Sequence, residues 1–334
     1  MSRHDRNKQA IARFRVALYD YDAAGFRAVL ADLFAPGCPV RLAYPFEDLD
    51  GPDALFETAY RPLVAALPDL ERRDTIVVAG DVDGADWVGC CGYYTGVFEN
   101  PWLTIPATRH QIAMRFHEFF RMEEGRVVEM QALWDIPEVM MQASAWPMAP
   151  SLGREWHVPG PATQDGIVPA PRDPDRSEAS VRLVFDMLEA LTRYAEGGVE
   201  AMALDRYWHE KTNWYGPAGI GTGRRIEGFR NFHQIPFLNA MPDRIGSAGK
   251  GSLFGDGDYV GFTAWPCLTA TISGDGWLGI APANQKVTMR SLDFWRCENG
   301  RIRENWVLVD ILDVYRQIGV DVFARMREFT HDRQ

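Results

Sequence analysis

The sequence contains two copies of one pattern, and this internal repeat constrains the fold more than any other feature. Residues 114–121, MRFHEFFR, match residues 289–296, MRSLDFWR, at a spacing of 175. The match continues through a Glu-x-Gly-Arg turn and a Leu-x-Asp-Ile segment, so that 12 of the 26 positions from 114 to 139 are identical in the second copy. Two copies at so long a period indicate duplicated domains rather than a solenoid of roughly 20–50-residue units.

The segment between the copies, residues 146–175, is rich in proline and glycine. Proline removes backbone hydrogen-bond donors and favours extended structure, so we expect a linker or a surface strap here. Trp146 and Trp156 lie within it and predict that the strap is pinned against a domain. The two domains are therefore expected at residues 1–145 and 176–334.

Each copy is expected to place its helices before its strands. In the second copy Ser177 is the expected N-cap of a first helix, and Pro236 should break or kink the third. The helices are predicted after Ser177, at 199–208 and at 225–241, with a matching opening helix at 6–21 in the first copy. The strands are predicted at 244–254, 259–273, 285–297 and 301–311. Helices followed by an antiparallel meander predict an α+β fold.

The last two predicted strands are joined by a glycine turn, residues 298–300 (ENG) in the second copy and 123–125 (EEG) in the first. A two-residue type I′ turn needs positive φ at both central positions, which Glu124 tolerates poorly. A three-residue loop is therefore predicted for both copies. In that register residue i faces residue 598 − i, and Asp293 is paired with Asn305.

Alternation along these strands puts one carboxylate on an otherwise mostly apolar face in each copy, Glu118 in the first and Asp293 in the second. Such a face must be buried, and burial raises the pKa of a lone carboxyl group by up to about 3–5 units. That environment suits a general base near neutral pH. The alternative is a structural carboxylate satisfied by a tyrosine, tryptophan or arginine. The opposite face is charged and aromatic, and we assign it to contact between copies or subunits.

Composition excludes several classes of partner. The 334 residues carry a formal net charge of −11, and the apolar runs fall far short of the roughly 18 residues of a membrane span, so neither nucleic acid nor membrane is expected. The polar N-terminus shows no secretory signal, and the five cysteines form no CxxC pair, which favours a reducing cytoplasm. Asn213 replaces the second histidine of an HExxH motif, and no lysine follows the glycines of 219–223, so no metal or cofactor is expected.

Three segments resemble the SnoaL-like polyketide cyclases, within the nuclear transport factor 2-like superfamily. They are 292–306 (LDFWRCENGRIRENW), 314–319 (VYRQIG) and 215–217 (YGP), and the resemblance covers both halves of the chain. It implies two cystatin-like cone domains, each a curved antiparallel sheet wrapped around helices and enclosing an apolar pocket. It also implies cofactor-independent chemistry on a hydrophobic small molecule, in which a carboxylate abstracts a proton α to a carbonyl. A tandem pair imitates the family dimer, which implies an intrachain pseudo-dimer and leaves a further homodimer open.

The chain departs from the family pattern at the catalytic position. Counting from the turn glycine, the acid/base aspartate of the cyclases corresponds to Val307, and their histidine on the partner strand corresponds to Asp293 and Glu118. The resemblance therefore implies either a base moved to the neighbouring strand or a loss of activity. His233 is a second catalytic candidate, because a neutral imidazole could donate a hydrogen bond to a developing enolate.

The second copy is expected to carry the active pocket, because the first copy has Ala59 in place of His233 and Met130 in place of Asn305. The candidate substrate-binding residues are Trp214, Tyr215, Trp295, Asn305, Val307 and, in the first copy, Glu118.

Three hypotheses remain open from the sequence. The first is a cyclase-like lyase or isomerase that acts on an apolar carbonyl compound with Asp293 as base. The second is a non-catalytic protein that binds a hydrophobic metabolite. The third is a pseudo-dimeric scaffold. An enzyme needs a cavity of roughly 300 Å³ or more that reaches Asp293, whereas a scaffold should show Asp293 bound to an arginine in a closed core.

Overall fold

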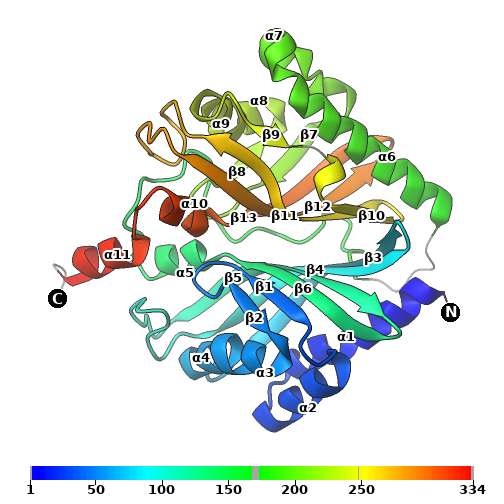
Figure 1. Cartoon of the computed structure of the whole chain (residues 1–334), viewed down its shortest axis with the longest axis vertical. Helices are drawn as coiled ribbons and strands as arrows, with labels where there is room; N and C mark the ends of the chain where they lie inside the picture. Colours follow the sequence, from blue (N-terminus) through cyan, green and yellow to red (C-terminus); the bar gives the residue numbers. More distant parts are fainter. Residues whose placement is uncertain (1, 168–172, 247, 332–334) are drawn as a thin grey trace. The chain divides into compact units, whose positions relative to one another are not determined.

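The computed structural model describes residues 2–167, 173–246 and 248–331. The chain divides into two compact units (Figure 1). Unit 1 comprises Met1–Pro147, Gly160–Pro171 and Asp321–Gln334, and unit 2 comprises Met148–Pro159 and Arg172–Val320. This division differs from the expected boundaries, because the proline- and glycine-rich segment is shared between the units and the C-terminal segment groups with unit 1.

Hydrogen bonds fix each part of the shared segment to its own unit. In unit 2 the indole Nε1–H of Trp156 donates to Oγ1 of Thr222 at 2.9 Å. In unit 1 the backbone N–H of Val77 donates to the carbonyl oxygen of Gly166 at 2.8 Å. The segment therefore lies against folded structure on both sides of the division.

Unit 1 begins with helices and continues with strands. Its helices are α1 (Arg3–Tyr19), α2 (Ala23–Leu33), α3 (Gly51–Leu55), α4 (Arg61–Ala66), α5 (Ile136–Gln142) and α11 (Val322–His331), with a π-helical turn at Phe56–Tyr60. Its strands are β1 (Pro39–Leu42), β2 (Asp48–Asp50), β3 (Glu71–Val82), β4 (Ala85–Val97), β5 (Gln111–Glu123) and β6 (Arg126–Trp134). Figure 1 shows α1 to α4 gathered on one face of this sheet.

Unit 2 repeats this order. Its helices are α6 (Pro174–Ala190), α7 (Tyr194–Ala201), α8 (Arg225–Phe229), α9 (Ile235–Ala240) and α10 (Ile311–Gln317), with a π-helical turn at Arg230–Gln234 and 3₁₀ turns at Leu191–Arg193, Leu204–Arg206 and Ala248–Lys250. Its strands are β7 (Trp208–Tyr215), β8 (Thr222–Arg224), β9 (Ile245–Gly246), β10 (Ser252–Asp256), β11 (Tyr259–Thr271), β12 (Lys286–Glu298) and β13 (Arg301–Val309).

Both sheets are mixed, whereas the sequence predicted purely antiparallel ones. The strand orders are β2-β1-β6-β5-β4-β3 and β10-β11-β12-β13-β7-β8, with β9 paired to β11. The first strand of each unit pairs in parallel with the last, β1 with β6 and β7 with β13, and all other pairs are antiparallel. The helices that connect these strands make the parallel pairing possible, because a parallel pair needs a long crossover. The α+β class is confirmed.

The hairpin turn between the last two strands differs from the predicted three-residue loop. Asn299 and Gly300 have φ values of 50° and 71°, and Glu124 and Gly125 have 48° and 78°, so both copies use two central residues with positive φ. A β-bulge follows, between Arg296 and Cys297 in unit 2. Glu124 accepts the left-handed conformation because the turn twist then matches the twist of the strands, which outweighs its local cost.

Two helix boundaries in unit 2 also differ from prediction. The N-cap of α6 is Asp173 rather than Ser177, and its side chain accepts from the N–H of Arg176. The helix expected to reach Trp208 ends at Ala201, since Ala203 has a φ of 46°, and Trp208 instead begins strand β7.

The proline in the third helix of each unit is accommodated by a π-helical turn. In unit 2 the N–H of Ile235 donates to the carbonyl oxygen of Arg230, five residues back, directly before Pro236. In unit 1 the N–H of Arg61 bonds to Phe56 in the same way, directly before Pro62. The widened turn makes room for a ring that would clash in an α-helix, so helical structure continues past each proline, whereas the sequence predicted a break or kink.

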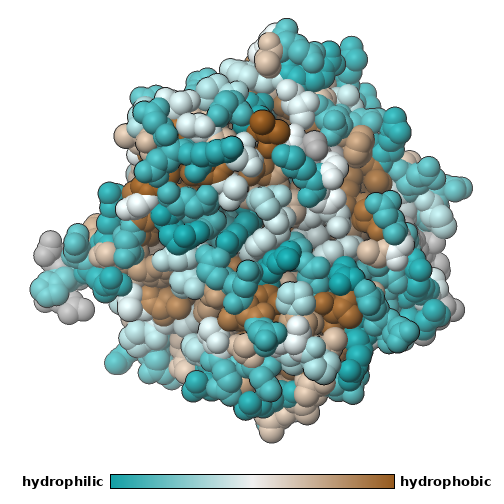
Figure 2. All heavy atoms as spheres, in the orientation of Figure 1, coloured by the Kyte–Doolittle hydropathy of each residue, from teal (hydrophilic) through white to brown (hydrophobic). Residues whose placement is uncertain are grey.

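The visible surface is mostly hydrophilic, with apolar residues in separate small areas (Figure 2). Within the described ranges, no helix combines the length and the apolar character that a membrane span requires.

Candidate functional site

Strand β12 carries Asp293 at the centre of the unit 2 sheet. Val307 of β13 lies directly opposite it on one side, and Phe262 of β11 lies opposite on the other. The predicted pairing of Asp293 with Asn305 is wrong by two residues, and Asn305 instead pairs with Trp295. The tighter hairpin turn shifts the register by one residue, and the β-bulge between Arg296 and Cys297 shifts it by one more. Since side chains alternate along a strand, a shift of two leaves every residue on its predicted face.

Asp293 is buried, and none of the described residues offers it a counter-ion. Its residue surface is 8% exposed, and among the described residues its one hydrogen-bond partner is Ser291, whose hydroxyl donates to Oδ1 at 2.8 Å. Burial raises the pKa of Asp293 from 3.8 to about 8, against a smaller lowering by the Ser291 hydrogen bond. The carboxyl group therefore exchanges its proton near neutral pH.

A cavity of about 430 Å³ reaches this carboxyl group. Its wall is largely apolar and aromatic, and it is contributed by the helices and by one face of the sheet. Among the residues that line it are Asp293, His233, Trp214, Trp295, Asn305 and Val307. All six are candidate site residues from the sequence, and the fold brings them together around one cavity.

His233 enters the cavity wall from the π-helical turn. Its imidazole stacks on Trp214 with ring centroids 4.3 Å apart and an interplanar angle of 9°. Burial lowers the pKa of His233 from 6.5 to about 3, so the ring is neutral at physiological pH. Its Nδ1 is buried and makes no hydrogen bond in the described structure.

Tyr215 is the one second-copy candidate outside the cavity lining. It follows Trp214 on β7, and successive side chains of a strand point to opposite faces. Its hydroxyl donates to Glu304 Oε1 at 3.2 Å, and its ring lies 5.3 Å from that of Trp306. This tyrosine belongs to the packing on the outer face of the sheet.

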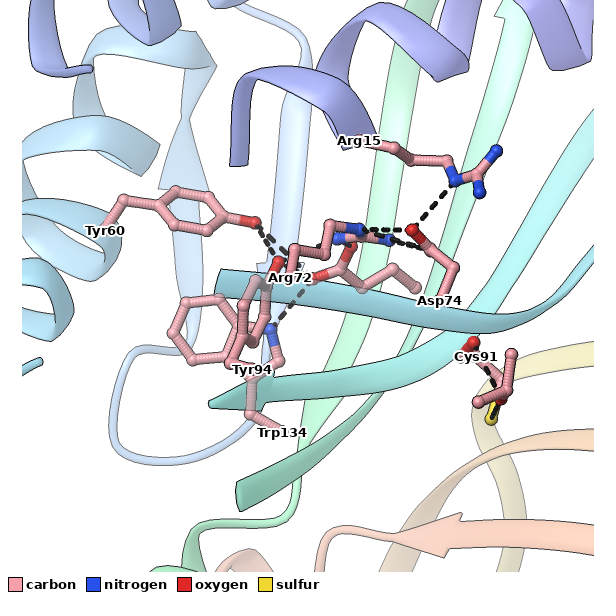
Figure 3. A network of polar contacts seen from close by, with 9 residues as sticks. Arg15, Tyr60, Arg72, Asp74, Cys91, Tyr94 and Trp134 are labelled. Carbon is pink, nitrogen blue, oxygen red and sulfur yellow. Dashed lines mark hydrogen bonds and ion pairs between the residues drawn. The ribbon is translucent and has the colours of Figure 1, made fainter. Parts of the chain in front are cut away.

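Glu118 occupies the position of Asp293 in unit 1, but its surroundings are different. Figure 3 shows four of the side chains around it, those of Tyr60, Arg72, Tyr94 and Trp134. Arg72 donates to its Oε2 at 2.6 Å, and Tyr94 and Trp134 donate to its Oε1 at 2.8 and 3.0 Å. Tyr60 approaches the same oxygen at 3.4 Å. Glu118 is 0% exposed, so no water-sized space adjoins it. These surroundings match the alternative given for the sequence, a carboxylate whose hydrogen bonds are satisfied by tyrosine, tryptophan and arginine side chains.

Three partners of Glu118 are replaced in unit 2 by residues that cannot donate a side-chain hydrogen bond. Strand pairing aligns Arg72 with Gly246 and Tyr94 with Leu268, since these residues pair with each other in their own sheets. It likewise aligns Trp134 with Val309. Gly246, Leu268 and Val309 all line the cavity. The lost side chains account for both the open volume and the unpaired state of Asp293.

Sequence reasoning did not name several polar residues of the cavity wall as site candidates, among them Ser291, Cys267 and Arg244. Ser291 lies two residues before Asp293 on the same face, a spacing that could have identified it. Cys267 lies in a bulge of β11 between Ala264 and Leu268, where alternation fails. The proline at position 266 was the available signal, because proline in a strand interior marks a bulge.

One group of side chains has the arrangement of a metal site, and it lies in unit 1. Ligand atoms of His4, Asp81 and Asp86 all lie within 4.8 Å of one another. The guanidinium of Arg3 is 2.9 Å from Asp86 and 3.5 Å from Asp81, so a positive charge already occupies this position. No second group of this kind occurs among the described residues.

Comparison with known proteins places both units in one family. The family model of the SnoaL-like polyketide cyclases matches residues 11–143 and 188–318. No curated protein is similar enough in sequence to count as a relative.

Solved structures with a similar fold each correspond to one part of the chain. A protein from Jannaschia sp. CCS1, assigned as a SnoaL-like polyketide cyclase, is 23% identical over 43% of this chain and 96% of its own, with a TM-score of 0.38. IdmH from Streptomyces antibioticus, assigned as a polyketide cyclase, is 19% identical over 41% and 98%, with a TM-score of 0.35. An NTF2-like protein from Burkholderia thailandensis E264 is 18% identical over 43% and 98%, with a TM-score of 0.32. Because the family model covers most of both units, the chain belongs to the SnoaL-like polyketide cyclase family.

Proposed function

We propose that unit 2 is a cofactor-independent acid/base enzyme of the cyclase, lyase or isomerase type, and that it acts on an apolar carbonyl compound. The observation that carries this proposal is the unpaired, buried Asp293 in an apolar cavity of about 430 Å³. A cavity of this volume accommodates a drug-sized molecule. A carboxyl group with a pKa of about 8 is strong enough as a base, and also as an acid, to transfer protons in both directions.

In the proposed reaction the ionised carboxylate of Asp293 removes a proton from the carbon α to a substrate carbonyl, which leaves an enolate and a protonated Asp293. In an aldol closure the enolate carbon then forms a bond to a second carbonyl carbon of the same molecule. The resulting alkoxide takes the proton back from Asp293, so the base is regenerated. In an isomerisation the proton returns to a different carbon.

His233 is proposed as a hydrogen-bond donor to the enolate oxygen. The low pKa of its imidazole supports a neutral ring that donates without transferring its proton. Stacking on Trp214 holds the ring plane, which lowers the entropy cost of positioning the donor. The apolar wall strengthens such a bond because water does not compete for it.

A binding protein without catalysis is the second candidate, and Val307 favours it. This valine stands where the family carries its acid/base aspartate, directly opposite Asp293. The scaffold hypothesis predicted an arginine on the carboxylate in a closed core. Unit 1 has this arrangement around Glu118, whereas Asp293 has no such partner among the described residues.

Proton exchange tests the proposal without knowledge of the substrate. The chain is incubated in D₂O with apolar aromatic ketones such as 1-tetralone, and loss of the α-proton signal is followed by NMR. We expect exchange faster than in buffer, and a decrease of about 10²–10⁴-fold in Asp293→Asn. Asp275→Asn, the same substitution in an exposed loop, is the matched control and should exchange like the unmodified chain. Equal rates in Asp293→Asn and the unmodified chain would leave only the binding function.

A further inference from the structure

Arg244 is a cation in the wall of the unit 2 cavity that the proposed reaction does not use. It lies in the connection between α9 and β9, two residues before Gly246, and its residue surface is intermediate in exposure. The same position in unit 1, at the offset of 174 that aligns Gly246 with Arg72, is the buried apolar Leu70. Unit 2 therefore carries its arginine two residues earlier along the chain than unit 1 does.

The partners of Arg244 are neutral. One guanidinium nitrogen, Nη2, donates to the carbonyl oxygen of Leu191 at 3.2 Å, and the guanidinium carbon lies 5.4 Å from the ring centroid of Tyr194. The neighbouring carboxylate of Asp243 accepts from the backbone N–H of Thr271 at 2.8 Å. Within the described part of the chain, no carboxylate lies within ion-pair distance of Arg244.

Two arginines that are more deeply buried than Arg244 have carboxylate partners. Arg72 pairs with Glu118 at 2.6 Å, and Arg296 pairs with Glu304 at 2.6 Å. A guanidinium that is partly removed from water without a counter-ion is costly, and desolvation lowers the pKa of Arg244. An anion bound from the cavity would offset this cost. The guanidinium has five N–H donors in a planar fork that fits a carboxylate bidentately.

We propose that Arg244 binds a carboxylate of the substrate, so that the cavity selects carbonyl acids over the corresponding neutral esters. This inference rests on the proposed function, in which Asp293 acts on a carbonyl elsewhere in the same cavity. Arg244 and neutral His233 are the only nitrogen-bearing basic side chains that line the described cavity, so the wall offers one positive charge. One positive charge matches a monoanionic carboxylate rather than a dianionic phosphate.

A matched pair of probes tests the inference. The probes are 6-acetyl-2-naphthoic acid and its methyl ester, and their dissociation constants are measured by quenching of tryptophan fluorescence at low salt. We expect the unmodified chain to bind the acid roughly 10- to 100-fold more tightly than the ester. Arg244→Gln should remove this preference by weakening the acid alone, and Arg244→Lys should keep part of it. Arg206→Gln, an exposed arginine in the same unit, should leave both constants unchanged.

Equal affinity for acid and ester in the unmodified chain would overturn the inference. An equal loss of affinity for acid and ester in Arg244→Gln would also overturn it, because it would indicate a structural role for the arginine. Binding of neither probe would overturn it too, because the cavity would then be closed to such compounds. Asp293→Asn separates the two proposals. If Asp293→Asn keeps the preference for the acid, and neither it nor the unmodified chain speeds α-proton exchange, the carboxylate site stands and the proposed catalysis fails. If exchange is equally fast with acid and ester, the catalysis stands and the role of Arg244 fails.

Discussion

The two units place an acidic residue at the same point of the same strand, and they use it in opposite ways. In unit 1 Glu118 is fully enclosed and bonded to Arg72, Tyr94 and Trp134. In unit 2 Asp293 accepts one hydrogen bond from the described residues, that of Ser291, and borders a cavity. The comparison teaches that a buried carboxylate acquires its function from its neighbours, since the two strands that carry it occupy the same place in their sheets.

Removing the charge of Glu118 should produce the largest effect on stability. Glu118→Gln leaves the buried guanidinium of Arg72 with Asp74 as its remaining acidic partner, and breaking a buried ion pair costs about 3–5 kcal/mol. Urea unfolding at pH 7 measures this change, with Asp293→Asn as the matched substitution in unit 2, for which we expect little change or a gain. A loss below about 1 kcal/mol in Glu118→Gln would contradict the structural role.

The stability of unit 2 should depend on pH through Asp293. Its pKa is about 8 in the folded chain and 3.8 in an unperturbed aspartate, so between these values the folded chain holds a proton that the unfolded chain has released. The contribution of Asp293 to the free energy of unfolding is therefore fully present below about pH 4. It is lost progressively as the pH rises from there through about 8.

Asp293→Asn cannot ionise, so its stability relative to the unmodified chain should rise by about 1 kcal/mol per pH unit over that interval. Thermal unfolding at pH 5, 6.5 and 8 measures the difference, with Asp275→Asn as control. A difference that is constant with pH would show that Asp293 does not titrate in this range.

Restoring one bulky side chain of unit 1 should close the cavity of unit 2. Val309 aligns with Trp134 and lines the cavity, so Val309→Trp places an indole beside Asp293. We expect the dissociation constant of a naphthyl ketone to rise roughly 10- to 100-fold, while Val309→Ile changes it little. Unchanged affinity in the tryptophan variant would place the binding site elsewhere.

His233 should make the smallest contribution of the residues considered. His233→Phe keeps an aromatic ring against Trp214 but removes the hydrogen-bond donor. Loss of one neutral hydrogen bond, worth about 0.5–1.5 kcal/mol, should lower the rate of α-proton exchange by up to about tenfold, with ketone affinity nearly unchanged. Affinity and rate that fall together would assign His233 to the cavity wall alone.

The sequence predicted the duplication, the α+β class and the face that carries Asp293, because these depend on local patterns with a fixed period. It did not predict the parallel pairing of β7 with β13, since that contact joins strands far apart in the chain. It also misjudged the turn at Glu124, where strand twist overrides the preference of a single residue.

The difference between the two carboxylates could not be predicted from the hairpin alone. Arg72 lies 46 residues before Glu118, and its side chain reaches the carboxylate only through the pairing of β3 with β4 and of β4 with β5. Arg244 and Cys267 were missed for a related reason. A connecting segment and a bulge do not follow the alternation on which the sequence argument depended.

The pKa of Asp293 tests the central claim most directly. The ¹³C carboxyl resonance of aspartate can be titrated from pH 3 to 10 in labelled protein and assigned by its absence in Asp293→Asn. Burial also raises the pKa of Cys267 to about 12 and lowers that of His233 to about 3, so neither neighbour titrates near pH 8. The account predicts a midpoint near 8 for Asp293. A midpoint near the ordinary value of about 4 would show a solvated or paired carboxylate, and the contrast with unit 1 would then have no chemical consequence.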